Sequence, residues 1–239
     1  MIDYLALMGV GPDGWGDDLA FGALVTLSVA FAGFFIGAVL GSLIAWARIA
    51  GTLPVKLLGE GYTTVLRGIP DLLVIYLFYF GGSAALGAIL GLFGHQGFVA
   101  IPSFAVGAAA IGVVSAAYQA EVFRGSFNAL SKDEMEAARA AGMHNALMFR
   151  RIIVPQLLRH AIPGLSNVWL LVLKESALVS VTGLAELMRT TQLAAGSTRM
   201  PFDFFLFGAV IYLAITFVST LVFAHLERRS RRGYREAMR

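Results

Sequence analysis

The chain has 239 residues, of which 58% are hydrophobic and 14% are charged, and it contains no cysteine. Soluble domains carry roughly one quarter charged residues, so this composition excludes an ordinary soluble protein and predicts an integral membrane protein. The absence of cysteine excludes disulfides and sulfur-ligated metal sites.

Charge-free runs long enough to cross a bilayer occur several times, since about 20 apolar residues span the ~30 Å hydrocarbon core. One run covers residues 19–47, and a longer run over 72–120 is divided by the turn-like segment 94–97. A further span surrounds Lys174, and the last run covers 204–226. We expect a single all-α transmembrane domain over residues 1–239, with five spans at about 19–47, 60–82, 98–122, 164–188 and 203–226.

The basic residues indicate the orientation of these spans. Of the 18 Lys and Arg residues, most follow the first, third or fifth span. Positive charge in short loops marks the cytoplasmic side. We therefore expect the N-terminus outside, the C-terminus in the cytoplasm and a long cytoplasmic loop over 125–163, which explains the net charge of +3 without a nucleic-acid partner. We expect the basic tail after Leu226 to contact anionic lipid headgroups.

The first span carries Gly33, Gly37 and Gly41 at four-residue intervals. This spacing places them on one helical face, where another helix can approach closely. The approaching helix belongs either to this chain or to a second chain.

The start of the second span is interrupted by Pro70, which removes a helical hydrogen bond. The span begins near Leu57, with Arg67 and Asp71 inside the membrane, or near Leu72, with both at its cytoplasmic face. If the helix persists, Arg67 and Asp71 can pair four residues apart. Intramembrane charges mark a pathway, a partner or a substrate, so the alternatives are substrate contact and a structural ion pair.

The fourth span contains the adjacent charges Lys174 and Glu175 near its middle. Adjacent residues on a helix point in different directions, so the two do not simply neutralise each other, and each should face another helix or an aqueous cavity. The alternative is a buried charge network that fixes helix register. The candidate translocation path comprises Arg67, Asp71, Lys174, Glu175, Ser176, Ser180 and Glu186.

The loop between the third and fourth spans contains a short, sharply bounded helix. Ser131 and Glu134 form a capping-box pattern at its start. Good helix formers follow, and Gly142 can adopt the left-handed conformation that ends a helix. Small Ala side chains within it would let a partner surface approach the backbone.

This loop carries Glu136-Ala137-Ala138, three residues, Gly142, nine residues, Ile152, one residue and Val154-Pro155. The pattern closely resembles the loop signature of permease subunits of ABC importers, with Val154 where Leu is usual. Arg67-Gly68-Ile69-Pro70-Asp71-Leu72-Leu73 and Lys174-Glu175-Ser176-Ala177-Leu178-Val179-Ser180 are similar to the other signature segments of the polar amino-acid group. Asp71 after the proline resembles its histidine, arginine and opine (octopine, nopaline) branch.

The resemblance implies a type I ABC importer permease fold and a coupling helix that docks in a cleft of a cytoplasmic ATPase. It also implies three partners: a second homologous permease subunit, a dimer of ATP-binding subunits that holds ATP and Mg, and an extracytoplasmic solute-binding protein. The implied ATPase-coupling residues are Glu136, Ala137, Ala138, Gly142, Ile152 and Pro155.

We therefore expect a transport subunit for polar or basic amino acids or opine-like derivatives, located in the inner (cytoplasmic) membrane. The chain has no Gly-x4-Gly-Lys-Ser/Thr phosphate loop, so we expect no enzyme activity, catalytic residue, metal or cofactor of its own. Two alternatives stay open: an ATP-independent secondary transporter in which Lys174, Glu175 and Glu186 relay ions, and a scaffold permease whose partner chain holds the substrate site.

Overall fold

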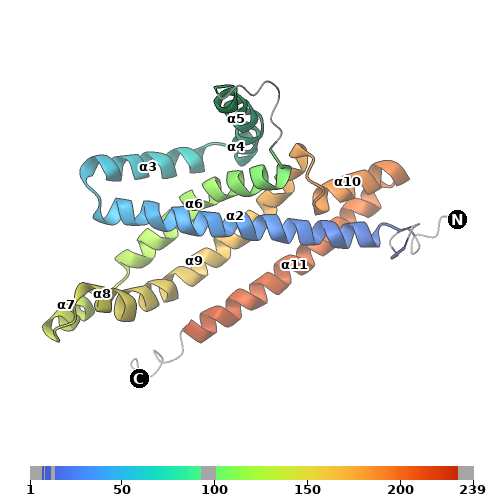
Figure 1. Cartoon of the computed structure of the whole chain (residues 1–239). Helices are drawn as coiled ribbons and strands as arrows, with labels where there is room; N and C mark the ends of the chain where they lie inside the picture. Colours follow the sequence, from blue (N-terminus) through green and yellow to red (C-terminus); the bar gives the residue numbers. More distant parts are fainter. Residues whose placement is uncertain (1–6, 8, 12–13, 93–100, 231–239) are drawn as a thin grey trace.

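The structure is a computed structural model that describes residues 7, 9–11, 14–92 and 101–230. Its described residues form helices and no strand (Figure 1). This confirms the all-α architecture with about five spans, while the expected turn at 94–97 and the basic residues after Ser230 lie outside the described residues. Within the described ranges, five helical segments are long and apolar enough to cross a membrane: Gly16–Ala50, Asp71–Leu90, Ser103–Asn128, Asn145–Thr182 and Pro201–Ser230.

The most closely packed pair of helices is α2 (Gly16–Ala50) and α6 (Ser103–Asn128), which lie side by side (Figure 1). A Cβ atom added at Gly37 would overlap the Ser115 hydroxyl, and one at Gly41 would lie 2.9 Å from the carbonyl oxygen of Ala116. The face formed by the glycines of α2 therefore packs within this chain, against α6.

The second span differs from its expected bounds of 60–82. Helix α3 (Leu53–Gly68) ends before Pro70, and α4 (Asp71–Tyr76), the π-helical turn η1 (Leu77–Gly81) and α5 (Gly82–Gly91) follow. Ile69 is extended, with φ −101° and ψ 148°, because a residue that precedes proline is disfavoured in the α conformation. The helical start at Asp71 matches the position of the later expected start, near Leu72, and the placement of Arg67 and Asp71 at the cytoplasmic face stays a prediction.

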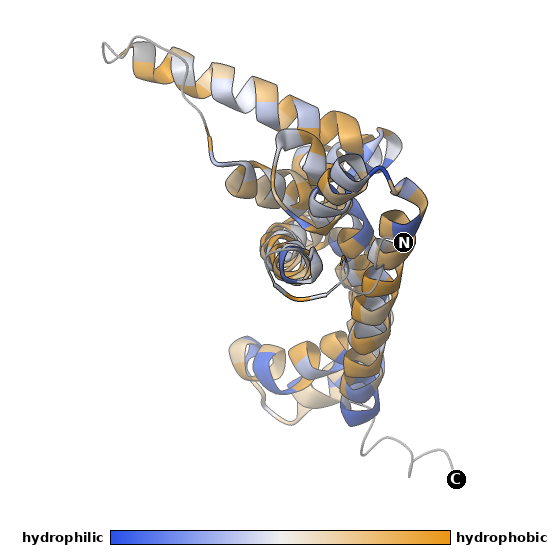
Figure 2. Cartoon of the chain, turned by 90° about the vertical axis from the view of Figure 1, so that its right-hand side faces the viewer, coloured by the Kyte–Doolittle hydropathy of each residue, from blue (hydrophilic) through white to orange (hydrophobic). Residues whose placement is uncertain are grey.

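Helices α4 and α5 with η1 leave the other helices sideways as an arm (Figures 1 and 2). Only 17% of the arm's most apolar window is buried within the chain. Leu73, Leu77 and Phe80 on the arm are exposed, and Figure 2 shows hydrophobic residues along it. The arm therefore offers an apolar surface to lipid or to another subunit.

The fourth span also differs from its expected bounds, 164–188. Helix α9 (Val154–Glu175) continues from α8 (Asn145–Met148) and the π-helical turn η2 (Phe149–Ile153), and the 3-10 helix η3 (Ser176–Thr182) follows it. Gly183 then adopts φ +82° and ends the segment. The helix starts earlier than expected because its first turns are amphipathic, and charged residues on the polar face of such a helix do not interrupt it.

The remaining elements lie at the two ends of the molecule. Helix α7 (Lys132–Ala140) lies with α8 at one end, and α10 (Leu187–Thr198) leads into α11 (Pro201–Ser230) at the other (Figure 1). Helix α6 extends to Asn128 and the helix toward α9 resumes at Asn145, so helices cover both ends of the expected loop 125–163.

The seam between α2 and α6 predicts a specific sensitivity to added volume. Gly37→Ala should lower the free energy of unfolding by about 1–3 kcal/mol, since overpacking a close contact forces side chains or backbone apart. The thermal unfolding midpoint in detergent measures the change.

The matched control is Gly61→Ala on α3, where an added Cβ finds no atom within 4 Å. That exchange should be neutral or stabilise by about 0.5–1 kcal/mol, because alanine is the better helix former. Equal midpoints for the two variants would contradict the close approach at Gly37.

Candidate functional site

Two carboxylates from different helices meet beside the break at Pro70. Asp71 is the first residue of α4, and Glu175 is the last residue of α9. Glu175 is 4% exposed, and no N–H group, hydroxyl or basic side chain among the described residues bonds to its carboxylate oxygens. Asp71 is near enough to act on it electrostatically. A buried carboxylate without a partner is costly, so this pair is suited to receive a cationic group.

Arg67 approaches the same region from the end of α3. Its guanidinium carbon lies 5.5 Å from the centroid of the Tyr118 ring, and its Nη1 lies 3.9 Å from Glu121 Oε1. The expected pairing of Arg67 with Asp71 requires a continuous helix, and the break at Pro70 removes that geometry. The structure thus brings Arg67, Asp71 and Glu175 around Tyr118, without a close ion pair between Arg67 and Asp71 in the described part.

The other expected residues of the fourth span have different surroundings. Lys174 is exposed and Glu175 is buried, in agreement with the expectation that these neighbours point in different directions. Ser176 is fully buried and donates to the carbonyl of Leu173 at 2.7 Å. Ser180 is buried in η3. Both serines therefore lie in the interior, whereas Lys174 faces outward from this chain.

Glu186 is the N-cap residue of α10, beyond the fourth span, and Tyr212 connects it to Ser176. Its carboxylate accepts hydrogen bonds from the hydroxyls of Thr26 and Tyr212, both at 3.1 Å, and from the backbone N–H groups of Met188 and Arg189, at 2.9 and 2.8 Å. Burial raises the pKa of Glu186, although these hydrogen bonds oppose the shift. Because its acceptor sites are occupied by α2, α10 and α11, Glu186 has a structural role here.

Helix α7, in the loop between the third and fourth spans, has the expected caps. The Ser131 hydroxyl accepts a hydrogen bond from the N–H of Glu134 at 3.4 Å. At the other end Gly142 adopts φ +78°, and the N–H groups of Gly142 and Met143 bond to the carbonyls of Arg139 and Ala138, both at 3.0 Å. These two bonds form a Schellman motif, which requires the left-handed glycine conformation.

The loop has a small core of its own, formed by Leu130, Ala138, Met148 and Ile153. Ala138 is 5% exposed and thus packs inward, where the small alanines were expected to face a partner. The side chain of Gln156 on α9 donates to the Glu134 carboxylate. Among the implied coupling residues, Ile152 is half-buried, and the outward-facing ones are Glu136, Ala137, Gly142 and Pro155.

An ion-pair cluster joins α2, α3 and α6, and the sequence did not indicate it. Arg48 Nη1 lies 2.5 Å from Glu121 Oε1 and also donates to the Thr63 hydroxyl at 3.1 Å. Arg124 bonds to the other oxygen of Glu121 at 2.8 Å. The spacing of Glu121 and Arg124 was visible in the sequence, but the contact with Arg48 joins residues 73 positions apart.

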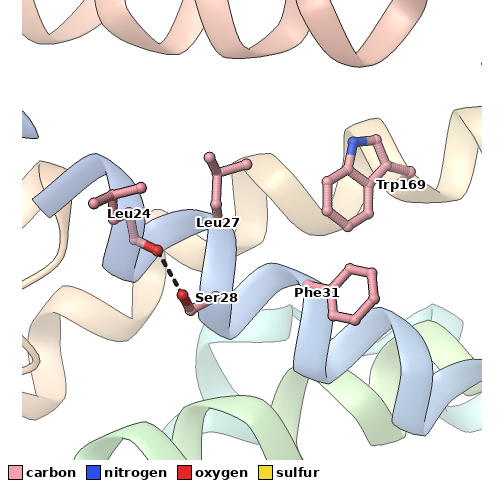
Figure 3. Close-up of a pocket in the computed structure, with 5 residues that line it drawn as sticks. All are labelled: Leu24, Leu27, Ser28, Phe31 and Trp169. Atoms are coloured by element: carbon pink, nitrogen blue, oxygen red, sulfur yellow. Dashed lines mark hydrogen bonds between the residues drawn. The ribbon is translucent and has the colours of Figure 1, made fainter. Parts of the chain in front are cut away.

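A groove between α2 and α9 is lined by Leu24, Leu27, Ser28, Phe31 and Trp169 (Figure 3). The Ser28 hydroxyl donates to the Leu24 carbonyl at 2.7 Å. The indole N–H of Trp169 is buried and has no hydrogen-bond partner among the described residues. With apolar walls and no charge, the groove does not fit a polar solute, and the cluster at Glu175 is the better candidate site.

Comparison with known proteins decides the family. Residues 37–232 match the family of binding-protein-dependent transport system inner membrane components. The chain belongs to this family. It is 56% identical to the octopine transport system permease protein OccQ of Rhizobium radiobacter, over 97% of this chain and 98% of that one.

The chain is also 39% identical to the histidine/lysine/arginine/ornithine transport system permease protein HisQ of Escherichia coli, over 90% of this chain and 94% of that one. A crystal structure of an amino acid ABC transporter with histidines superposes with a TM-score of 0.78 and 32% identity, covering 96% of this chain and 99% of that chain. These likenesses confirm the expected resemblance to permease subunits of ABC importers and the expected fold.

The network around Glu186 yields a stability prediction. Glu186→Ala leaves the Thr26 and Tyr212 hydroxyls and two helix N–H groups without their acceptor, so it should cost about 2–4 kcal/mol of unfolding free energy. Tyr212→Phe removes one hydrogen bond of the same network and should cost about 1 kcal/mol. Thermal unfolding of the detergent-solubilised protein measures both. Full stability of Glu186→Ala combined with loss of transport would instead assign Glu186 to the translocation path.

Proposed function

We propose that this chain is the permease subunit of an ATP-driven importer for opines or basic amino acids and forms half of the translocation pathway. The observation that carries the proposal is the buried carboxylate of Glu175, which lies beside Asp71 and has no cationic, N–H or hydroxyl partner among the described residues. Such a pair would bind an ammonium or guanidinium group by charge-assisted hydrogen bonds. The transport-system names of OccQ and HisQ, octopine in one and histidine, lysine, arginine and ornithine in the other, support this substrate class.

Lys174 supports the proposal that a second permease completes the pathway. It lies in the fourth membrane span and is exposed on the surface of the single chain. A charged side chain that faces hydrocarbon is costly, so this surface would be covered by a partner subunit or line an aqueous cavity. Facing such a cavity, Lys174 or Arg67 would bind the carboxylate of the substrate.

The end of the molecule with α7 and α8 would face the cytoplasm. Lys132, Arg139, Arg150 and Arg151 are exposed there, as the positive-inside rule requires of cytoplasmic loops. In this orientation the N-terminus lies outside the inner membrane. The exposed residues Glu136, Ala137, Gly142 and Pro155 would dock on a dimer of ATPase subunits that holds ATP and Mg, and a solute-binding protein would deliver substrate on the other side.

The substrate role is tested by Glu175→Gln, which removes the charge and keeps the shape. In proteoliposomes that contain the assembled transporter and its binding protein, uptake of the basic substrate should fall about 10–100-fold, the loss expected for one charge-assisted contact of about 1.5–3 kcal/mol. Glu60→Gln, an exposed carboxylate on α3, is the control and should transport normally. Unchanged uptake by Glu175→Gln would remove this residue from the site.

The coupling role is tested separately with two glycines that both have open space around them. Neither Gly142 nor Gly125 has an atom within 4 Å of an added Cβ, but only Gly142 has a positive φ. Gly142→Val should therefore distort the end of α7, and transport driven by ATP should fall at least tenfold while the protein still inserts. Gly125→Val should have a much smaller effect. Undiminished transport by an assembled Gly142→Val complex would contradict the coupling role.

A further inference from the structure

Helix α10 is held rigidly between α2 and α11 at the end of the molecule opposite α7 and α8 (Figure 1). A Cβ at Gly22 on α2 would lie 2.9 Å from the Thr190 hydroxyl, and one at Gly208 on α11 would lie 2.8 Å from the Thr191 hydroxyl. These close approaches and the Glu186 network leave α10 little freedom to shift. Residues at the C-terminal end of α10 are therefore held in a fixed position.

That end carries Arg199, the only non-glycine residue with a positive φ in the part of the chain that the structure describes, at +58°. The conformation follows from the short turn, since α10 ends at Thr198 and α11 begins at Pro201. Glycine is the residue that relieves the strain of this conformation. Arginine stands there instead, and it is exposed, with no ion pair or side-chain hydrogen bond to any described residue. The strain is thus retained together with a cation that no described residue of the chain pairs with.

We propose that Arg199 and the neighbouring Phe202 form a docking surface for the solute-binding protein, and that Arg199 pairs with a carboxylate of that protein. Phe202 is 76% exposed directly after the turn, and arginine and aromatic side chains are the residues enriched at binding hot spots. The family depends on a binding protein, and the inference rests on the orientation and function proposed above.

The charges at this end favour a protein over an anionic lipid headgroup. Asp17 and Asp18 are exposed at the start of α2, at the same end of the molecule as the α10 to α11 turn (Figure 1). Their negative charge opposes anionic headgroups, whereas a protein surface can carry complementary charges of both signs. A fixed guanidinium also matches a fixed carboxylate, because the planar fork binds it in one geometry.

The test measures ATP hydrolysis by the complete transporter in nanodiscs while the ligand-loaded binding protein of the same system is titrated. Arg199→Gly should raise the half-saturating concentration of the binding protein at least tenfold with the maximal rate unchanged. Glycine suits the left-handed position, so thermal stability should be equal or higher, and misfolding cannot explain the effect. Arg199→Lys should give an intermediate value, and Arg229→Gly at the other end of α11 should match the unmodified protein.

Added salt should raise the half-saturating concentration for the unmodified protein more than for Arg199→Gly, since an ion pair is screened. An unchanged half-saturating concentration for Arg199→Gly would overturn the docking surface while leaving the proposed function intact. An effect confined to nanodiscs with anionic lipid would also overturn it, in favour of a headgroup contact. No stimulation of the unmodified transporter by the binding protein would overturn the proposed function and this inference with it.

Discussion

The close contact between α2 and α6 is the constraint on which the rest of the structure depends. Lipid tails are as apolar as the side chains of the spans, so helices in a bilayer associate through close packing and interhelical hydrogen bonds. The glycines of α2 provide the packing, and the buried amide of Gln119 provides a hydrogen bond from α6 to the Phe34 carbonyl at 3.0 Å. The Arg48 to Glu121 pair closes the same seam toward the loop end.

The contact between α2 and α6 also determines where the candidate site lies, because α6 is at the centre of the molecule. Two thirds of its most apolar window is buried, 67%, whereas the last span buries 6%. Tyr118 and Glu121 on α6 hold the end of α3 through Arg67, and α9 packs along another side of α6 with Glu175 at its last turn. The charges near Glu175 thus come from three helices, α3, α4 and α9. All three of these helices pack against α6.

The features that were predicted well from the sequence depend on residues close together in the chain. The loop helix follows from Ser131 and Gly142, which act within a few residues, and the number of spans follows from apolar runs. The Glu186 network and the contact between Arg48 and Glu121 join residues far apart in the chain, and no spacing rule indicates them. The observed helices differ from the expected span bounds where α9 starts earlier, at Val154, and where Pro70 divides one expected span into two helices.

Helix α9 provides a direct mechanical path between the two candidate functional regions. It begins after the small core of the loop, with Gln156 bonded to Glu134, and it ends at Glu175. A π-helical turn precedes it and a 3-10 helix follows it, and such irregular turns often mark hinges. A helix transmits displacement along its axis as a rigid element, whereas the turns at its ends can absorb rotation. In the proposed importer, a movement of α7 would therefore reach the buried carboxylate through the contact between Glu134 and Gln156 and then along α9, where Pro163 removes one helical hydrogen bond and allows bending.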